Sequence, residues 1–456
     1  MKRFFLLGVE LCVSAALVFA GGKPQSGGST AGKSGPTLII SMLGYDDTQV
    51  ATWENTLKEN REIAREKGTA LVNNGLTGEG YYRIKNRQDA EKMFPDVKWE
   101  WVDWGWAETL DTKQRSMIAA GTPPTMLAGE GFFPAYAESG LLQEVPAYVL
   151  EGLNKNLIYY GMNGKAYGVA MKTSPFMLFY NKGLMRKAGL DPNKPPATWD
   201  EWKAMAKQIT DAGKGQFWGG GIPSFPHLGG GLRATPFFRQ NGTDFAINGR
   251  INLNDPKLQA TLQFIREMNA FFPPGLGNGT DEDPLWKAFH EDQTIAFAIN
   301  GSWQEVNCRS WGMDYGVAPL PIPAGGQAGN CLVGTVYCGV PAGIPQAETD
   351  IFWKFYKEIC LGENNIIYLQ YENLMIPTQK YLDDQRYYQG EGKESLRVSA
   401  YEMGASSFGG VAVFLKNHAD VWDILNSQVL ARVTMSNDPI SRICSEAQSK
   451  IETLTR

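Results

Sequence analysis

The sequence predicts an α/β fold, and three observations support this prediction. Short apolar segments typical of buried strands alternate with longer segments whose apolar residues have helical spacing. The chain has 456 residues, enough for two or three domains. Hydrophobic residues make up 43% and charged residues 20% of the chain, a composition typical of soluble globular proteins. We therefore expect layered α/β domains, and we find no internal repeat.

The first twenty residues have the pattern of a cleavable signal peptide. Lys2 and Arg3 supply the positive start, residues 4–19 are mostly apolar, and Ala20 is a small residue that suits cleavage. Glu10 interrupts the apolar run, and an uncleaved anchor is the alternative interpretation. The run is shorter than the ~20 apolar residues that a transmembrane helix needs. We expect export and no membrane-embedded segment.

The cysteines and histidines argue against a lipoprotein and against a metal site. Cys12 lies inside the apolar run rather than just after it, so it is not placed to carry a lipid. We therefore expect a free protein in the periplasm, without cofactor or metal. The odd number of cysteines left after cleavage allows at most two disulfides, and the pairing is open. These cysteines are Cys308, Cys331, Cys338, Cys360 and Cys444.

Residues 21–36, GGKPQSGGSTAGKSGP, have the composition of a flexible linker. Gly27 and Gly32-Lys33-Ser34 match the spacing of a phosphate-binding loop. That loop requires a strand before it and a helix after it, whereas here a leader precedes it and Gly35-Pro36 follows it. We interpret the match as a coincidence of linker composition.

The elements expected first after the linker alternate between strands and helices. Residues 37–43 (TLIISML) form an apolar run typical of a buried strand, and residues 46–67 are compatible with a helix. A second strand is expected over 97–101. A helix over 109–120 is stopped by Gly121 and Pro123-Pro124, and a short strand follows over 125–128.

The middle of the chain continues this alternation. Strands are expected over 164–169 and 177–180, followed by a helix over 182–188. Thr198 and Glu201 have the spacing of a capping box, which predicts the start of the next helix. Later helices are expected to open at Asp255-Pro256 and to cover residues 350–360, 422–430 and 439–454.

Charge and aromatic content narrow the classes of function. Lys and Arg number 43 against 48 Asp and Glu, giving a net charge of -5, which argues against a nucleic-acid-binding protein. The chain holds 13 Trp, 18 Tyr and 22 Phe. Most of these must form the core, but some are expected to line a site for a flat, partly apolar ligand.

Three ordered passages resemble extracellular solute-binding protein family 1, the sugar-binding components of ABC importers. They are IAAGTPPTMLAGEGFFPAYAESGLLQEV (118–145), NGKAYGVAMKTSPFMLFYNKGLMRKAGLDPNKPPATWDEWKAMAKQIT (163–210) and IAFAINGSWQEV (295–306), which YGVAPLPIPAGG soon follows. A weaker passage, IPTQKYLDD, begins at Ile376. The chain departs from the family pattern at Thr125, where Asp is usual, and in an unusually long segment between Gly44 and Val97.

The resemblance implies a two-lobed, type II-like periplasmic-binding-protein fold with a ligand cleft between the lobes. Three crossovers are expected near residues 171–175, 319–323 and 376–377. The implied division is a signal peptide (1–20), a linker (21–36), an N-terminal lobe (37–171 plus 321–375) and a C-terminal lobe (175–319 plus 376–456). The implied function is capture of a sugar or oligosaccharide by hinge closure and its delivery to the membrane subunits of an ABC importer, with a monomer as the default state.

A sugar site needs aromatic rings for the C–H faces and polar groups for the hydroxyls. Trp303 follows a strand, where the resemblance implies an aromatic that stacks on the sugar; the alternative is a core residue. Glu130 and Phe132 follow the short strand after the paired prolines, where the resemblance implies ligand contacts. For Glu130 the alternative is a solvated loop carboxylate, and for Phe132 it is core packing.

Further candidates lie at other strand ends and turns. Tyr45, Asp46 and Asp47 follow the first strand, although Asp equally suits a helix N-cap. Gly334 and Thr335 are expected at a turn close to the ligand. The weaker candidates are Lys172 at the first crossover, Trp218, Phe225 and His227 in a glycine-rich stretch, and Phe408 in a late loop. Trp104 and Trp106 are interpreted as packing residues.

Two other classes of function stay open. The same fold would also suit a polyamine, a phosphate ester, a peptide or a metal chelate, or a protein that presents its ligand to a sensor kinase. A glycoside hydrolase would need a pair of carboxylates flanking the scissile bond, and no local motif singles out such a pair. Neither the identity, length and linkage of the sugar nor the role of residues 48–96 follows from the sequence.

Overall fold

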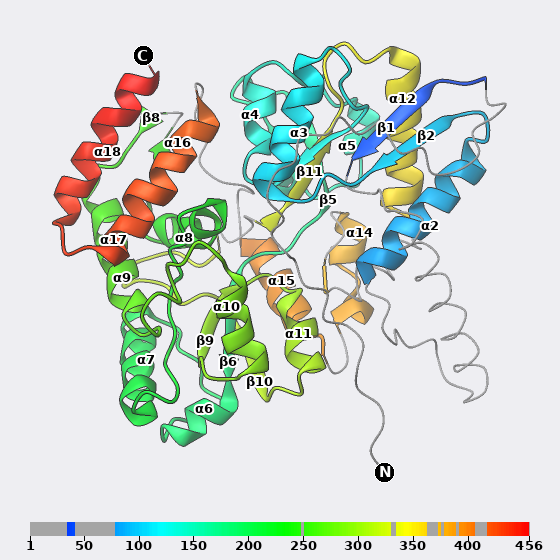
Figure 1. Cartoon of the computed structure of the whole chain (residues 1–456). Coiled ribbons are helices and arrows are strands. Elements are labelled where there is room, and N and C mark those ends of the chain that lie inside the picture. Colours follow the sequence, from blue (N-terminus) through cyan, green and yellow to red (C-terminus); the bar gives the residue numbers. More distant parts are fainter. Residues whose placement is uncertain are drawn as a thin grey trace, which may run out of the picture.

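The computed structural model describes residues 34–41, 78–247, 250–329, 334–362, 373–374, 378–388, 392–405 and 417–455 (Figure 1). The predicted signal peptide, most of the predicted linker and the helix expected over 46–67 lie outside these residues. The described chain forms two α/β lobes, as predicted.

The first lobe is built on two small sheets that meet edge to edge. Strand β1 pairs in parallel with β2, a second sheet has the order β3-β11-β5-β4, and a bridge from Ile40 to Met126 joins the two sheets. These strands are β1 (Thr37–Ser41), β2 (Lys98–Val102), β3 (Leu127–Gly129), β4 (Ile158–Tyr160), β5 (Ala166–Lys172) and β11 (Val336–Gly339). The helices of this lobe are α2 (Gly78–Met93), α3 (Ala107–Ala119), α4 (Phe133–Glu138), α5 (Ala147–Leu150) and α12 (Gln346–Phe355).

The second lobe has a three-stranded antiparallel sheet in the order β10-β6-β9, surrounded by helices. The strands are β6 (Met177–Asn181), β9 (Phe297–Asn300) and β10 (Tyr315–Ala318). The principal helices are α6 (Lys182–Lys187), α7 (Trp199–Gly213), α8 (Leu228–Gln240), α9 (Pro256–Asn269), α11 (Gln304–Ser310), α15 (Glu394–Ala405), α16 (His418–Ile424), α17 (Arg432–Met435) and α18 (Ile440–Thr455). A hairpin of β7 (Ala246–Ile247) and β8 (Arg250–Ile251) packs beside α18.

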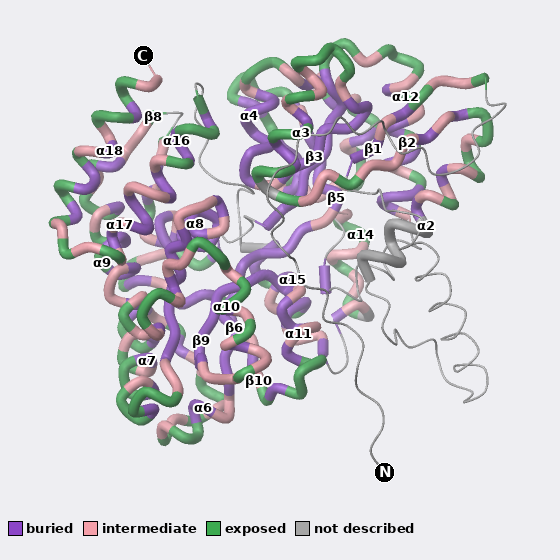
Figure 2. Tube along the Cα trace, viewed as in Figure 1, coloured by how far each residue is buried: buried purple, intermediate pink, exposed green. Residues whose placement is uncertain are grey.

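Local sequence signals explain why the helices begin where they do. Thr198 and Glu201 form the predicted capping box at the start of α7. Asp255 accepts hydrogen bonds from the first backbone amides of α9, with Pro256 in the first turn. Trp202 in α7 and Leu258 in α9 are fully buried. Figure 2 shows buried residues along the strands at the centre of both lobes and exposed residues on the outer helices.

Two connecting segments lie against each other where the chain passes between the lobes. The first runs from β5 to β6 and the second from β10 to β11, and the Oγ1 atoms of Thr173 and Thr335 are 2.8 Å apart in a buried hydrogen bond. Ser174 Oγ accepts a hydrogen bond from the backbone N–H of Ser302 at 2.7 Å. These buried, mutually bonded polar groups hold the two connecting segments together where the lobes join.

The residues near the second and third connections contact different lobes. Ile322 pairs with Thr198 of the second lobe through a parallel bridge. The helix α14 (Gln379–Leu382) touches the first lobe, because the Gln379 amide donates to the Gly152 carbonyl at 3.0 Å. Helix α15 packs on β10 of the second lobe. The lobe bounds expected from the sequence stay a prediction.

The described part of the unusually long segment between Gly44 and Val97 is largely helix α2, which lies at the outer side of the first lobe (Figure 1). Glu91 on this helix accepts hydrogen bonds from Arg87 Nε at 2.9 Å and from Trp101 Nε1 of β2 at 3.2 Å. These contacts attach the end of the added segment to the sheet.

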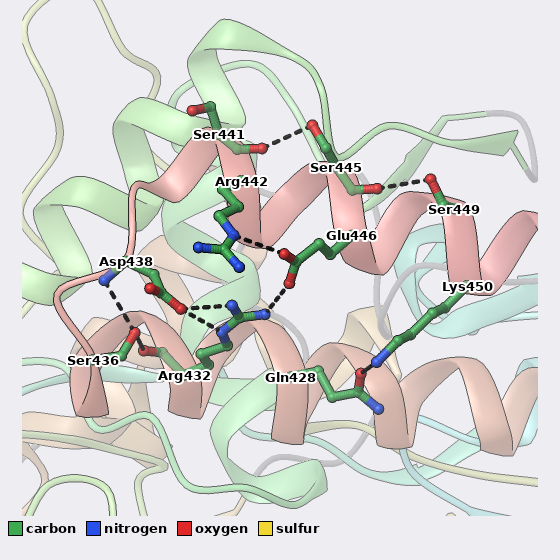
Figure 3. Close-up of polar contacts among 10 residues, drawn as sticks. All are labelled: Gln428, Arg432, Ser436, Asp438, Ser441, Arg442, Ser445, Glu446, Ser449 and Lys450. Atoms are coloured by element: carbon green, nitrogen blue, oxygen red, sulfur yellow. Dashed lines mark hydrogen bonds and ion pairs between the residues drawn. The ribbon is translucent and has the colours of Figure 1, made fainter.

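An ion-paired cluster attaches the C-terminal helix to the second lobe (Figure 3). Glu446 of α18 lies between Arg432 Nη1 at 2.6 Å and Arg442 Nε at 2.8 Å, and these two guanidinium groups lower the pKa of its carboxyl to about 2. Arg432 also pairs with Asp438 at 2.5 Å. Because these side chains are partly exposed to solvent, each pair contributes little to stability.

The four cysteines within the described residues, Cys308, Cys338, Cys360 and Cys444, are buried and unbridged. Cys331 lies outside the described residues. Burial raises the pKa of the Cys308 and Cys444 thiols to about 12, so both are uncharged at neutral pH.

Candidate functional site

The first-lobe side of the site gathers at the ends of β2, β3 and β5. Glu130 directly follows β3, and Lys172 is the last residue of β5 before the chain crosses to the second lobe. Trp106, the residue that precedes α3, lies 4.6 Å from the Lys172 ammonium group, measured to the ring centroid. The structure therefore brings together two predicted residues, Glu130 and Lys172, with an aromatic ring beside them.

Glu130 has an unusual electrostatic environment. Burial of its carboxyl raises the pKa, and the charges of Glu282 and Glu108 raise it further, whereas Lys172 and Arg233 lower it. Burial is the dominant cause, so the neutral form is favoured over a wider pH range than for an exposed carboxyl. A neutral carboxyl can both donate and accept a hydrogen bond, as a ligand hydroxyl can.

The second-lobe side is built around Arg233 on α8. Its side chain is only 7% exposed, and its guanidinium forms a two-point ion pair with Glu282, with Nη2 to Oε2 at 2.8 Å and Nη1 to Oε1 at 3.0 Å. The ring centroids of Phe176, Phe225 and Trp286 surround it at 5.7, 5.7 and 4.8 Å. The guanidinium is thus neutralised by one carboxylate and held in place by three rings.

A glycine at the start of α8 makes this ion pair possible. A Cβ atom on Gly229 would clash with Glu282 Oε1. The absence of a side chain therefore lets the carboxylate lie against the first turn of the helix, where the positive end of the helix dipole favours an anion.

Trp303 lies at the base of the site, beside both connecting segments. It follows β9 and precedes α11, and its half-buried ring meets Phe176 of the first segment edge to face at 6.1 Å. Gly334 of the second segment lies close by, since a Cβ atom there would be 3.7 Å from the Trp303 ring. The ring also packs against the core, and its role as an aromatic ligand contact stays a prediction.

The other predicted residues have mainly structural surroundings. Thr335 is fully buried and bonded to Thr173, and Phe132 is buried edge to face against Tyr136 in the first-lobe core. Trp218 extends the edge of β9 through a bridge to Ile295 and packs against the second-lobe core. His227 caps α8 and stacks on Phe225. Tyr45, Asp46, Asp47 and Phe408 lie outside the described residues.

Sequence reasoning missed several residues that the fold places at this site. Trp106 was interpreted as a packing residue, and the structure leaves it 38% exposed; its position after the second strand was the available signal. Trp104, by contrast, does pack against the core. Glu108, Arg233 and Glu282 had no motif that could have singled them out, because they come together from three separate segments.

This arrangement offers polar groups and aromatic rings to a ligand. Trp106 lies on the first lobe with the Lys172 ammonium group over its ring, Trp303 is half-buried beside the connecting segments, and Glu130 and Lys172 lie at the ends of β3 and β5. Within the described ranges, no group of three or more His, Cys, Asp or Glu side chains is arranged to hold a metal ion. Among the same residues, no helix is both long and apolar enough to cross a bilayer.

The raised pKa of Glu130 predicts how stability depends on pH. Its value in the folded protein lies above the ordinary 4.5, so between these two pKa values the folded state binds more protons than the unfolded state. The contribution of Glu130 to the free energy of unfolding is therefore fully present at low pH. It is lost as the pH rises through the pKa of Glu130 in the folded protein. Glu130→Gln, which mimics the neutral form, is expected to be more stable than the wild type at pH 8 by an amount on the order of 1 kcal/mol, and equally stable near pH 4.

Urea unfolding of both chains between pH 4 and 8 measures this difference. Asp211→Asn is the matched control, since Asp211 is an exposed carboxylate in an i,i+4 pair with Lys207. A difference between Glu130→Gln and wild type that does not change with pH would contradict the expected effect.

Comparison with known proteins places the chain among binding proteins. Residues 74–358 match the sequence profile of a family described as bacterial extracellular solute-binding protein. The chain is 23% identical over 254 residues to the maltodextrin-binding protein MdxE of Bacillus subtilis, covering 54% of this chain and 58% of that one. It is 24% identical over 263 residues to the sn-glycerol-3-phosphate-binding periplasmic protein UgpB of Pectobacterium atrosepticum, covering 53% and 55%. The chain thus spans about half the length of the curated relatives it matches.

Solved structures show the same fold over nearly the whole chain. Maltose-bound MalE3 of T. maritima superposes with a TM-score of 0.68 at 18% identity, covering 92% of this chain and 100% of that one. UgpB of Mycobacterium tuberculosis, in complex with glycerophosphocholine, has a TM-score of 0.67 at 16% identity, covering 83% and 95%. At these identities the likeness establishes the two-lobed fold.

Proposed function

Because this chain belongs to the bacterial extracellular solute-binding protein family, we propose that it captures a sugar or oligosaccharide between its lobes and delivers it to an ABC importer. The family and the two-lobed fold support the general role of solute binding. The maltodextrin-binding relative supports carbohydrate as the class of solute. The predicted signal peptide supports a periplasmic location for the free protein.

The observation that carries the carbohydrate proposal is that an aromatic ring from each lobe and a carboxyl of raised pKa lie at strand ends near the connecting segments. Trp106 is 38% exposed on the first lobe, and Trp303 is half-buried at the base of the second. Flat rings cover the apolar C–H faces of a sugar, while Glu130 can donate to or accept from its hydroxyls. The protein groups that bond the sugar hydroxyls then decide which sugar is accepted. Each buried polar group that the bound sugar leaves without a hydrogen-bond partner lowers the binding free energy by about 1–3 kcal/mol.

The charge balance favours a neutral solute over an anionic one. Glu282 neutralises Arg233 through two ion-pair contacts, and the Lys172 ammonium group lies over the Trp106 ring. A phosphate ester would have to compete with Glu282 for Arg233. A phosphate ester is nevertheless the second candidate, because Arg233 and Lys172 approach the site from opposite lobes and because one relative is a glycerol-phosphate-binding protein.

Hinge closure provides the mechanism of capture. The connecting segments that hold Thr173 and Thr335 form the pivot, and the ligand-facing groups sit on both sides of it. A ligand that contacts both lobes binds the closed form more tightly than the open form and shifts the population toward it. Importer subunits would then recognise the closed shape.

A ligand panel tests this proposal. Melting temperature and isothermal titration calorimetry would be recorded with maltose, maltotriose, other mono- and oligosaccharides, glycerol-3-phosphate, a polyamine and a short peptide. A bound ligand at 100 times its Kd raises the free energy of unfolding by about 2.7 kcal/mol, which a melting curve resolves. Binding of sugars is expected; binding of glycerol-3-phosphate alone would replace the carbohydrate proposal by the phosphate-ester one.

A second measurement separates binding from hydrolysis. Nitrophenyl glycosides incubated with the chain are expected to release no nitrophenol, since the proposal is capture without bond cleavage. Release above the rate of a boiled sample would support the glycoside hydrolase alternative.

A further inference from the structure

A single hydrogen bond joins the start of one helix in the first lobe to the start of another helix in the second. Oε1 of Glu108, in the first turn of α3, accepts a hydrogen bond from the backbone N–H of Leu228, the first residue of α8, at 3.1 Å. The two residues are 120 positions apart in the chain. Figure 1 shows α3 packed in one lobe and α8 in the other, so this bond exists only when the lobes approach each other.

The start of α8 is well suited to accept a carboxylate. His227 caps the helix through Nδ1, which accepts from the Gly229 amide at 3.2 Å, while the Gly230 amide bonds to the His227 carbonyl at 2.9 Å. The Leu228 amide is the remaining donor of this turn, and Glu108 satisfies it. The positive end of the helix dipole strengthens a bond to a charged acceptor.

The surrounding residues hold the donor in place. His227 stacks on Phe225 with ring centroids 5.4 Å apart and planes inclined by 3°. One turn further, the Arg233 guanidinium donates to the Gly229 carbonyl at 2.9 Å and pairs with Glu282. The first turn of α8 is therefore a rigid element. The exposed Glu108 side chain extends from the first lobe to this turn.

We propose that Glu108 is a positioning residue that holds the lobes closed by capping helix α8 of the opposite lobe. The proposal rests on the proposed hinge closure, although it does not depend on which solute is bound. Because the bond forms only in the closed arrangement, it shifts the ratio of closed to open forms, by about five- to tenfold for a partly exposed charge-assisted bond at a helix start.

The position of Glu108 links this contact to the ligand site. Trp106 lies two residues before it at the start of α3, beside Lys172. The same short segment thus presents a ring to the ligand and a carboxylate to the opposite lobe. Closing the lobes brings both into place together, so losing the Glu108 bond is expected to shorten the lifetime of the bound state without removing a ligand contact.

The experiment removes the acceptor and the donor separately. Glu108→Ala removes the carboxylate. Leu228→Pro removes the backbone N–H at a first helical position where proline is well tolerated, and His227 before it is already extended, with φ -144° and ψ 179°. Leu228→Ala is the matched control, because it removes the same buried side chain but keeps the N–H. Glu144→Ala, which removes an exposed first-lobe carboxylate paired with Lys165, controls for the loss of charge.

The ratio of closed to open forms is measured by small-angle X-ray scattering of the full chain without ligand. We expect Glu108→Ala and Leu228→Pro each to lower the ratio of closed to open forms about five- to tenfold. The double variant is expected to be no more open than either single variant, because both substitutions remove the same bond. Both control variants are expected to match the wild type. Equal scattering by Glu108→Ala and the wild type, or additive effects of the two substitutions, would overturn the proposal. If Leu228→Pro fails to fold, the scattering of Glu108→Ala compared with that of the Glu144→Ala control still tests the proposal.

A kinetic arm uses maltotriose as the probe. Stopped-flow dissociation is expected to be about five- to tenfold faster for Glu108→Ala than for the wild type, with an association rate changed less than threefold. An unchanged dissociation rate would count against the proposal. If maltotriose binds none of the chains, the choice of sugar in the proposed function is in question, whereas the scattering of the ligand-free chains still tests the role of Glu108.

Discussion

Replacing Glu305 by alanine is expected to lower the free energy of unfolding by about 3–5 kcal/mol, the largest stability effect of any single substitution considered for this chain. Glu305 lies on α11 and is fully buried. Its carboxylate accepts hydrogen bonds from Asn373 Nδ2 at 2.6 Å, the Ser395 amide at 3.0 Å, the Glu394 amide at 3.2 Å and the Tyr315 hydroxyl at 2.8 Å. The Ser395 hydroxyl also donates to it.

The physical reason is the number of donors that one carboxylate satisfies. The Glu394 and Ser395 amides belong to the first turn of α15, so Glu305 caps that helix from a neighbouring helix. Alanine would remove the acceptor of these two backbone amides, whereas the Asn373 amide would keep its bonds to the Gly392 carbonyl and to Ser395 Oγ. Burial raises the pKa of the Glu305 carboxyl, while the Ser395 and Tyr315 donors oppose that shift.

Guanidinium unfolding followed by circular dichroism measures this loss. Asp211→Ala, which breaks an exposed pair with Lys207, is the control and should change stability by less than about 0.5 kcal/mol. Glu305→Gln should lose less than alanine, because it keeps one acceptor oxygen in a similar volume. A loss below about 1 kcal/mol for Glu305→Ala would show that the α15 cap contributes little.

Replacing Trp303 by alanine is expected to weaken sugar binding about 100-fold, which corresponds to about 2.7 kcal/mol. The ring is half-buried between the two connecting segments, edge to face with Phe176 and next to Gly334. Under the proposed function, a ring beside the connecting segments would meet the ligand whichever lobe moves. Removing it would also leave a void in the closed form.

Trp311→Ala is the matched control for this loss. Trp311 follows the same helix α11, but it is 49% exposed and its ring lies near His290 rather than near the hinge. Calorimetric titration with the best sugar of the panel should show an unchanged Kd for Trp311→Ala, and Trp303→Phe should retain most of the affinity. A Kd for Trp303→Ala within threefold of the wild type would show that Trp303 is a core residue, the alternative interpretation of its sequence position.

Residues close together in the chain made much of the fold predictable. The strand expected over 37–43, which the structure describes over 37–41, the helices that start at Thr198 and Asp255, and the helix stopped before Gly121 follow from local hydrogen-bonding and apolar patterns, and the described residues confirm them. The two-lobed architecture followed from the resemblance of long ordered passages, and the family match and the fold comparison confirm it.

The site was only partly predictable. Glu130, Lys172 and Trp303 were singled out because they end strands or begin a crossover, and the fold places them around the pivot. Trp106 was interpreted as a packing residue, but the structure leaves it 38% exposed, because exposure of a large ring depends on what packs against it, which the local sequence does not state.

By itself the sequence determined where elements begin and end and to which family the chain belongs, because caps, apolar periodicity and ordered motifs act over a few neighbouring residues. Only the tertiary structure decided the contacts between residues far apart in the chain. Arg233 and Glu282 are 49 residues apart, Glu305 and Ser395 are 90 apart, and Glu108 and Leu228 are 120 apart. Such pairs carry no local signal, since their free energy comes from burial and charge that exist only after the chain has folded.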